Sequence, residues 1–202
     1  MSVVSDTTPA RYFDALYAED DPFGYRSRWY EERKRKLLLA ALPWARFDSA
    51  WELGCSNGEL TAALAPRCGR LLATDLDARA VALARARAAS LAHVEVAHMA
   101  HPARFPDERF DLVVFSEVGY YFGAADLDAV IRGMRAALND RGVLVACHWR
   151  HPFDAAPLCG RRVHAALEQA LGASGFRYGD ADMLLEGWSS DPHSVAEHEG
   201  LR

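Results

Sequence analysis

The chain has 202 residues and is 50% hydrophobic, which is enough for one globular domain with a sizeable core. Its formal net charge of -5 provides no basic surface field for phosphates, so we expect no nucleic-acid partner. No apolar run approaches the length of a membrane span, and the first residues lack the basic and apolar segments of a signal peptide. We therefore expect a cytoplasmic protein without a membrane partner.

Cysteine and histidine spacing argues against disulfides and metal sites. The four cysteines form no CxxC pair and no zinc-finger spacing, and we interpret them as reduced thiols. Two His-x-x-His pairs, His98/His101 and His148/His151, have the spacing of metal ligands. Neither pair lies on an evident helix, and no acidic or thiolate partner has a matching spacing, so we expect no metal ion.

The segment ahead of the first predicted strand is rich in aromatic residues. Residues 1–10 are expected to be a loose tail, and 11–47 a helical cap. Within the cap we predict a helix over about 26–42 that Pro43 ends. The charged run Glu31–Lys36 in this helix is typical of a solvated face with local acid–base pairs.

From Ser49 onward, short apolar runs alternate with stretches of helical spacing. The apolar runs predict strands at 49–54, 71–75, 94–98, 110–116 and 142–148. The other stretches predict helices at about 57–66, 78–90, 125–138 and 160–172, then one or two strands within 176–189 and a loose tail over 191–202. Near-continuous apolar strands separated by helices are typical of a parallel sheet covered on both faces, so we predict one α/β domain over 48–190.

The most informative segment joins the first predicted strand to its helix. Glu52-x-Gly54-x-x-x-Gly58 places two glycines where a strand turns into a helix, and ligand crevices of α/β sheets lie at such strand ends. A dinucleotide-binding loop needs three glycines. Here Ser56 occupies the position of the middle glycine, and Gly58 comes one residue too early to be the third. The loop is therefore compatible with a smaller nucleoside with an amino-acid tail, and the alternative is a purely structural turn.

An acid at the end of the second predicted strand completes a nucleoside site. Asp75 is placed to accept both hydroxyls of a ribose. Asp77 precedes the next helix and is expected to cap it. After the third strand, Met99 and the nearby backbone either frame an adenine ring or simply end an ordinary strand, and both interpretations stay open.

Two further strand ends carry candidate catalytic residues. After the fourth strand come Glu117, Tyr120 and Tyr121, at the edge where a substrate would meet the nucleoside. The alternative is that the aromatic residues only pack beneath the following helix, but Glu117 has no obvious structural partner. The fifth strand delivers His148 to the same edge.

Together these residues resemble a class I S-adenosylmethionine-dependent methyltransferase over about 48–150. The resemblance rests on the loop at 52–58, on Asp75, and on the segments 110–114 and 138–144. A closer likeness, to the nodulation protein S (NodS) group of N-methyltransferases, extends over most of the chain. The segments that carry it are 13–17, 21–25, 29–34, 116–121, 148–150 and 162–164.

The resemblance implies a Rossmann-like fold with a mostly parallel seven-stranded sheet and helices on both faces. It implies S-adenosyl-L-methionine as cofactor, S-adenosyl-L-homocysteine as product, and a monomer or weak homodimer. Enzymes of the NodS group methylate an amine on a chitooligosaccharide, so the implied acceptor is an amine of a small molecule or amino sugar. The implied catalytic residues are Glu117, Tyr120 and His148. The implied cofactor-binding residues are Trp29, Arg33, Glu52, Gly54, Cys55, Ser56, Gly58, Asp75, Leu76, His98, Met99 and Ser116.

Two other classes share parts of this pattern. A non-catalytic nucleoside-binding protein of the same fold would have the same loop and acid. An NAD-dependent oxidoreductase would prefer the full three-glycine loop and a hydride-transfer group such as Tyr-x-x-x-Lys. The two lysines of this chain, Lys34 and Lys36, both precede the first predicted strand, which disfavours that class.

Overall fold

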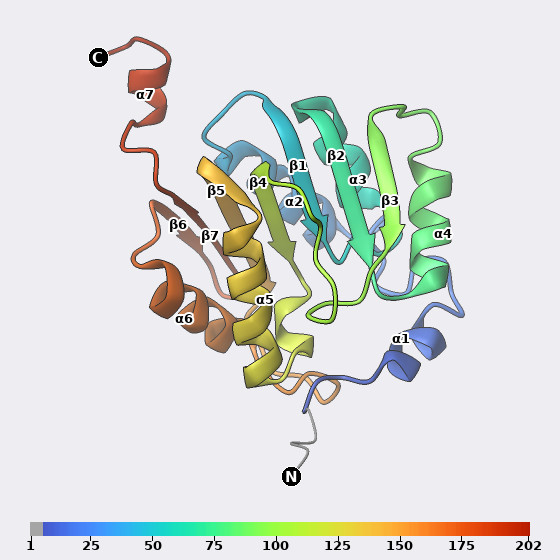
Figure 1. Ribbon diagram of the computed structural model, residues 1–202. Coiled ribbons are helices and arrows are strands. Elements are labelled where there is room, and N and C mark those ends of the chain that lie inside the picture. The colour runs from blue at the N-terminus through green and yellow to red at the C-terminus, as the bar shows by residue number, and fades with distance from the viewer. Residues whose placement is uncertain (1–5) are drawn as a thin grey trace.

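Seven strands form a single mixed sheet in the order β3-β2-β1-β4-β5-β7-β6 (Figure 1). The computed structural model describes residues 6–202. Its strands are β1 (Phe47–Leu53), β2 (Cys68–Asp75), β3 (Val94–His98), β4 (Phe110–Ser116), β5 (Leu138–Trp149), β6 (Phe176–Gly179) and β7 (Met183–Ser189). Its helices are α1 (Ala10–Leu16), α2 (Trp29–Ala41), α3 (Glu59–Leu64), α4 (Ala78–Arg87), α5 (Ala124–Ala136), α6 (Gly160–Leu171) and α7 (Val195–His198).

The strand order reverses next to β1. This strand pairs in parallel with β2 on one side and with β4 on the other, while β3 lies outside β2 and β5 outside β4. The chain therefore builds outward in one direction from β1 to β3 and in the other from β4 to β5. The carboxyl ends of β1 to β4 lie at the lower edge of the sheet in Figure 1, on the side of α1. In α/β sheets this switch point is where ligands bind.

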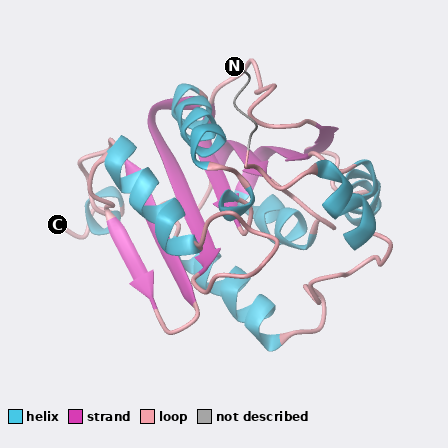
Figure 2. Ribbon diagram, turned by 90° about the horizontal axis from the view of Figure 1, so that it is seen from below, coloured by secondary structure: helices cyan, strands magenta, loops and turns pink. Residues whose placement is uncertain are grey.

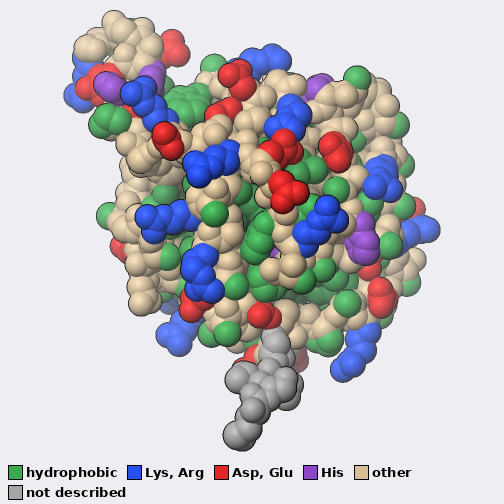
Figure 3. Space-filling model, in the orientation of Figure 1, with side chains coloured by type: hydrophobic (Ala, Val, Ile, Leu, Met, Phe, Trp, Pro, Cys, Tyr) green, Lys and Arg blue, Asp and Glu red, His purple; other side chains and the backbone are tan. Residues whose placement is uncertain are grey.

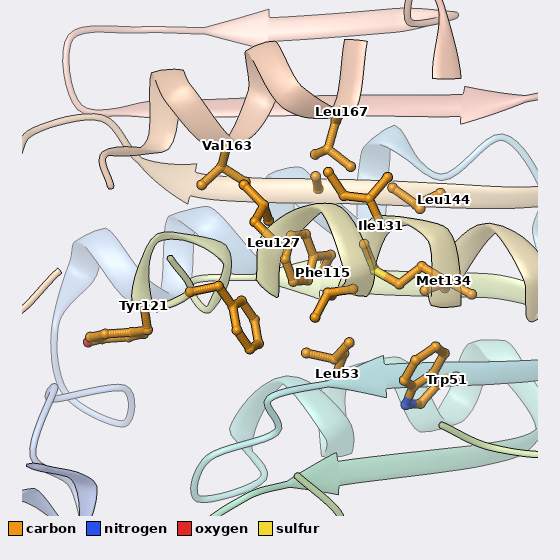
Figure 4. Packing of buried hydrophobic residues seen from close by; sticks show 14 of the residues in the cluster. Trp51, Leu53, Phe115, Tyr121, Leu127, Ile131, Met134, Leu144, Val163 and Leu167 are labelled. Carbon is orange, nitrogen blue, oxygen red and sulfur yellow. The ribbon is translucent and has the colours of Figure 1, made fainter. Parts of the chain in front are cut away.

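Helices flank the sheet on both sides (Figure 2). Helices α5 and α6 lie over one face, where Leu127, Ile131 and Val163 belong to the same core as Leu53 and Phe115 of the strands (Figure 4). Helices α2, α3 and α4 lie over the opposite face. Since neighbouring strand residues point to opposite faces, covering both faces requires the continuous apolar runs seen in the sequence.

The predicted α/β fold is confirmed, and the differences lie mostly at element ends. Strands β3 and β4 have the predicted bounds. Strand β5 starts earlier than predicted, because Leu138 pairs with Phe110 across a register shift. The strands predicted within 176–189 form the hairpin β6–β7, which adds antiparallel pairs beside β5.

Both segments predicted as loose tails make defined contacts. Thr8 is buried, its N–H donates to the Tyr121 carbonyl at 2.8 Å, and its hydroxyl donates to the Ala155 carbonyl at 2.7 Å. Near the other end, Ser194 and Glu197 form a capping box at α7. Residues 1–5 of the predicted tail lie outside the described residues. The two Thr8 hydrogen bonds attach the start of the described chain to the turn after β4 and to the loop after β5.

The face of the molecule shown in Figure 3 carries acidic and basic side chains intermixed over its whole area. No single sign of charge dominates this face. Among residues 6–202, none of the helices has both the length and the apolar character needed to cross a bilayer.

Candidate active site

The loop after β1 has a left-handed backbone at three positions. Gly54 and Gly58 have φ values of 80° and 81°, and Ser56 between them has a φ of 51°, which a serine rarely adopts. The Ser56 N–H donates to the Asp75 carboxylate at 2.9 Å, and its hydroxyl accepts from the Tyr17 hydroxyl at 2.7 Å. Ser56 thus takes a backbone conformation that favours glycine and attaches the loop to the end of α1.

Asp75, the last residue of β2, and Asp77, two residues later, make different contacts. Asp75 lies at the strand end, accepts the N–H groups of Ser56 and Asp77, and faces a cavity. Burial raises the pKa of Asp75 to about 6, against the lowering effect of these backbone bonds. Asp77 accepts the N–H groups of Arg79 and Ala80 at 2.8 Å and caps α4, which confirms its predicted role.

Three cavities meet at Glu117, the residue after β4. The loop cavity has about 420 Å³, open mouth included, and its walls include Glu31, Lys34, Glu52, Cys55 and Asn57. The acid cavity has about 710 Å³, and its walls include Tyr17, Asp75, Leu76, Met99 and His101. The aromatic cavity has about 1000 Å³, and its walls include Tyr30, Tyr120, Tyr121, Trp149 and Phe153.

Lys34 of α2 lies buried between two carboxylates. Its Nζ is 2.7 Å from Glu31 Oε2 and 3.2 Å from Glu117 Oε1, and it also lies over the rings of Tyr25 and Tyr30. Burial alone would lower the pKa of Lys34, but Glu117 and Glu31 raise it above its ordinary value, so the ammonium keeps its charge. Both glutamates line the loop cavity and the aromatic cavity, so this ion group stands between the two.

The Glu117 carboxylate is held from several directions. Its backbone has a φ of 58°, a strained value for a non-glycine residue, and its N–H donates to the Cys147 carbonyl at 2.9 Å. The Tyr120 hydroxyl donates to Glu117 Oε2 at 2.5 Å, and the Trp149 N–H donates to the same oxygen at 3.3 Å. With Lys34 on the other oxygen, the carboxylate has a defined orientation at the junction of the cavities.

Aromatic rings form the walls of the third cavity. Tyr30 meets Trp149 edge to face with ring centroids 5.3 Å apart, and Tyr120 meets Phe153 in the same way at 5.0 Å. The buried Tyr30 hydroxyl has no hydrogen-bond partner within residues 6–202. Burial raises the pKa of this phenol, so it stays protonated. A buried hydroxyl without a partner is costly, and a polar ligand that reached it would remove that cost.

The structure brings most of the predicted site residues to these cavities. Gly58 lies in the loop itself, where a side chain would meet the Cα of Ala84 in α4 at 2.8 Å. Glu117 and Tyr120 line the aromatic cavity. The predicted residues in the walls of the loop cavity or the acid cavity are Glu52, Gly54, Cys55, Ser56, Asp75, Leu76, Met99 and Ser116.

Besides Gly58, four predicted site residues lie outside the walls of the three cavities. Trp29 is 65% exposed at the start of α2, and Arg33, one turn further, pairs with Asp180 at 2.8 Å. Trp29 and Arg33 lie on the same face of α2, and the ion pair of Arg33 is with Asp180 in the turn between β6 and β7. His98 is exposed at the end of β3, and His148 is fully buried.

Two residues of α2, Glu31 and Lys34, were missed as site residues. The charged run that contains them has the pattern of a solvated face, but both side chains are buried, which corrects that expectation. Glu31, Lys34 and the buried Leu38 follow one another at intervals of three and four residues, which is the spacing of a helix face turned toward the protein. That periodicity was the available signal.

Comparisons with known proteins show the family. A family profile described as methyltransferase domain matches residues 50–142. Nodulation protein S of Bradyrhizobium diazoefficiens is 30% identical over 154 residues, a match that covers 74% of this chain and 70% of that protein. The chain belongs to the class I S-adenosylmethionine-dependent methyltransferases. S-adenosyl-L-methionine is the cofactor of this family.

Solved methyltransferase structures agree with the fold. A candidate methyltransferase from Pseudomonas syringae is 46% identical with a TM-score of 0.71, and the match covers 80% of this chain and 99% of that one. N-methyltransferase NodS of Bradyrhizobium japonicum WM9, in complex with S-adenosyl-L-homocysteine, is 27% identical with a TM-score of 0.80, covering 91% and 98%. The predicted likeness to the NodS group is therefore confirmed.

The match to other curated relatives is shorter. Nodulation protein S of Rhizobium tropici is 32% identical over 130 residues, which are 63% of this chain and 55% of that protein. For the Sinorhizobium fredii protein the identity is 35% over 131 residues, 63% of this chain and 60% of that protein. The chain thus spans little more than half the length of these two relatives.

Proposed function

We propose that this methyltransferase methylates an amine of a small molecule or amino sugar. The observation that carries the proposal is the Glu117 carboxylate, which lies where the three cavities meet. A carboxylate at this point can hold an ammonium group or accept its proton. The likeness to NodS, an N-methyltransferase, supports an amine as the acceptor.

The loop and acid cavities have donors and acceptors that fit S-adenosylmethionine. Asp75 uses two backbone N–H groups, and its carboxylate keeps lone pairs for two ribose hydroxyls. Leu76 and Met99 offer apolar walls for adenine. When bound, the cofactor supplies a methyl group activated by its sulfonium. Glu52 and the loop backbone complete the proposed cofactor side.

The aromatic cavity fits the acceptor. An amine must present a neutral lone pair, and Glu117 is placed to take the proton of an incoming ammonium. Tyr120 keeps the carboxylate oriented through its 2.5 Å hydrogen bond. The rings of Tyr30 and Trp149 offer faces for the apolar side of a sugar ring and for cationic groups. Positioning of this kind contributes much of the rate in reactions that need no covalent intermediate.

Glu117 fits the role of base better than His148. Both nitrogens of the His148 ring are engaged, since Nε2 accepts the Gly119 N–H at 3.1 Å and Nδ1 lies 3.2 Å from His164 Nε2. Burial lowers the pKa of His148 well below its ordinary value. The ring therefore has no nitrogen free for an acceptor amine.

Two measurements test the proposal. Calorimetry measures binding of S-adenosylhomocysteine and, separately, of NADH. Transfer of a radiolabelled methyl group is then measured on a panel of amine-bearing sugars, with the N-acetylated form of each sugar as its matched control. We expect binding of S-adenosylhomocysteine and label on the free amines only.

Each other outcome supports a different function. Binding of S-adenosylhomocysteine without label on any amine indicates a non-catalytic nucleoside-binding protein. Label on the acetylated controls indicates transfer to oxygen, and binding of NADH alone indicates an oxidoreductase.

A further inference from the structure

A line of buried polar side chains runs inward from the surface beside β6 to the turn after β4. Arg177 of β6 pairs with Glu186 of β7, and the Glu186 carboxylate is bonded to Nδ1 of His164 in α6. Nε2 of His164 is 3.2 Å from Nδ1 of His148, whose Nε2 accepts the N–H of Gly119 at 3.1 Å. We call His148, His164 and Glu186 the buried relay. Their exposed fractions are 0%, 3% and 1%.

The geometry determines which nitrogen carries the hydrogen on each ring. A backbone N–H can only donate, so Nε2 of His148 must accept and its Nδ1 must carry the hydrogen. His148 therefore donates to Nε2 of His164, and Nδ1–H of His164 donates to the Glu186 carboxylate. A protonated His164 would point a second N–H at that of His148, so both rings are neutral. Burial acts to raise the pKa of Glu186, but His164 and Arg177 outweigh it and hold that pKa below the ordinary value.

The relay does not have the form of a proton path. It ends at the backbone amide of Gly119, which does not release its proton to a neighbouring base. What the relay does supply is a fixed acceptor for that amide. A buried, fully satisfied polar network specifies one arrangement of the elements it joins, here β5, α6, β7 and the turn Gly119–Tyr121.

This turn directly adjoins the proposed acceptor side. The His148 ring packs edge-on against Tyr120 with centroids 5.6 Å apart, and the Tyr120 hydroxyl donates to Glu117. The residue after His148 is Trp149, whose N–H also donates to Glu117. A side chain at Gly119 would lie 2.8 Å from His148 Nε2, so only glycine allows this approach.

We propose that His148, His164 and Glu186 are positioning residues that fix the turn Gly119–Tyr121 and, through it, the orientation of Glu117 and Tyr120. The kinetic consequence of this inference rests on the proposed function, whereas its structural consequence does not. Asp75 and the loop after β1 hydrogen-bond elsewhere, so loss of the relay should affect the acceptor side and spare the cofactor side.

The first test uses the unaltered protein. Imidazole nitrogen NMR reports which ring nitrogen carries the hydrogen, and we expect Nδ1–H on both His148 and His164 at neutral pH. An Nε2–H tautomer on either ring would overturn the relay, because Gly119 or His148 would then face a donor instead of an acceptor.

The second test measures hydrogen exchange of the Gly119 amide in three variants. His164→Leu interrupts the relay and should speed this exchange by about tenfold. His164→Gln keeps one acceptor and one donor, and should restore slow exchange. His93→Leu is the matched control, because it removes a histidine bond to the Ala65 carbonyl at the opposite edge of the sheet.

The outcomes separate positioning from general stability. Unchanged exchange in His164→Leu, or an equal increase in His93→Leu, contradicts the proposal. With an amine accepted by the wild type, His164→Leu should raise KM for the amine or lower kcat while the Kd for S-adenosylhomocysteine stays within about twofold. A parallel loss of S-adenosylhomocysteine affinity would also contradict it. If the wild type methylates no amine, the proposed function fails, but the tautomer and exchange results still decide the relay.

Discussion

The proposed cofactor side and the proposed acceptor side of the site are built in different ways. On the cofactor side, Ser56 and Asp75 are joined by one β–α–β unit, and the Ser56 backbone N–H donates to the Asp75 carboxylate. On the acceptor side, Glu117 is held by Lys34 from α2, by the Trp149 backbone from β5 and by Tyr120 from its own turn. The first side depends on one loop and one strand end. The second depends on residues from several elements.

The largest effect should come from Glu117→Gln. The amide keeps the shape of the side chain but cannot accept a proton from an ammonium, so we expect turnover to fall by roughly 10²- to 10⁴-fold. The measurement is methyl transfer at saturating cofactor, with the affinity for S-adenosylhomocysteine measured separately by calorimetry. Turnover equal to that of the wild type would remove Glu117 from the proposed mechanism. Equal loss of turnover and cofactor affinity would break the distinction between the two sides.

Asp75→Ala probes the cofactor side. Removing a carboxylate that accepts ribose hydroxyls should weaken binding of S-adenosylhomocysteine by roughly 10- to 100-fold, as expected for charged hydrogen bonds. Asp77→Ala is the matched control, since it removes a neighbouring acid that caps α4. It should lower stability by about 1 kcal/mol and leave the Kd unchanged. Wild-type affinity in Asp75→Ala would contradict the ribose assignment.

The difference between the two sides also explains which features the sequence could predict. The fold, the loop and Asp75 follow from local periodicity and spacing, because each strand end and its loop are continuous in the chain. For Lys34, the helical spacing with Glu31 and Leu38 indicated burial, but not its pairing with Glu117, which lies far away in sequence. His148 lies near the end of β5, as the sequence predicted, but the sequence alone cannot show that His164 of α6 engages its Nδ1.

The buried Glu52 should make the stability of the protein depend on pH. Glu52 is buried on β1, and burial raises its pKa to about 8 although the Thr61 hydroxyl donates to it at 2.6 Å. Folded Glu52 therefore keeps its proton at neutral pH, while the unfolded chain releases it above about pH 4.3. The stability that the raised pKa of Glu52 contributes is fully present below about pH 4.3 and is lost as the pH rises toward about 8.

Glu52→Gln should remove this pH dependence. Between about pH 5 and about pH 7, the wild type should lose up to about 1.4 kcal/mol of unfolding free energy per pH unit relative to the variant. Urea unfolding at several pH values measures the difference. Parallel curves for the two proteins would mean that Glu52 is ionised in the folded state.

The smallest expected effect concerns the bond that attaches the loop to α1. Tyr17→Phe removes the hydroxyl that donates to Ser56, and we expect stability to fall by about 1 kcal/mol, the usual contribution of one hydrogen bond. Ser56→Gly removes the other partner but also relieves the left-handed serine, so its net cost should be smaller. Since both variants break the same bond, the double variant should be about 0.5–1 kcal/mol more stable than the sum of the two losses implies. Strict additivity in urea unfolding would show that the bond contributes nothing, and that Ser56 keeps its conformation through Asp75 alone.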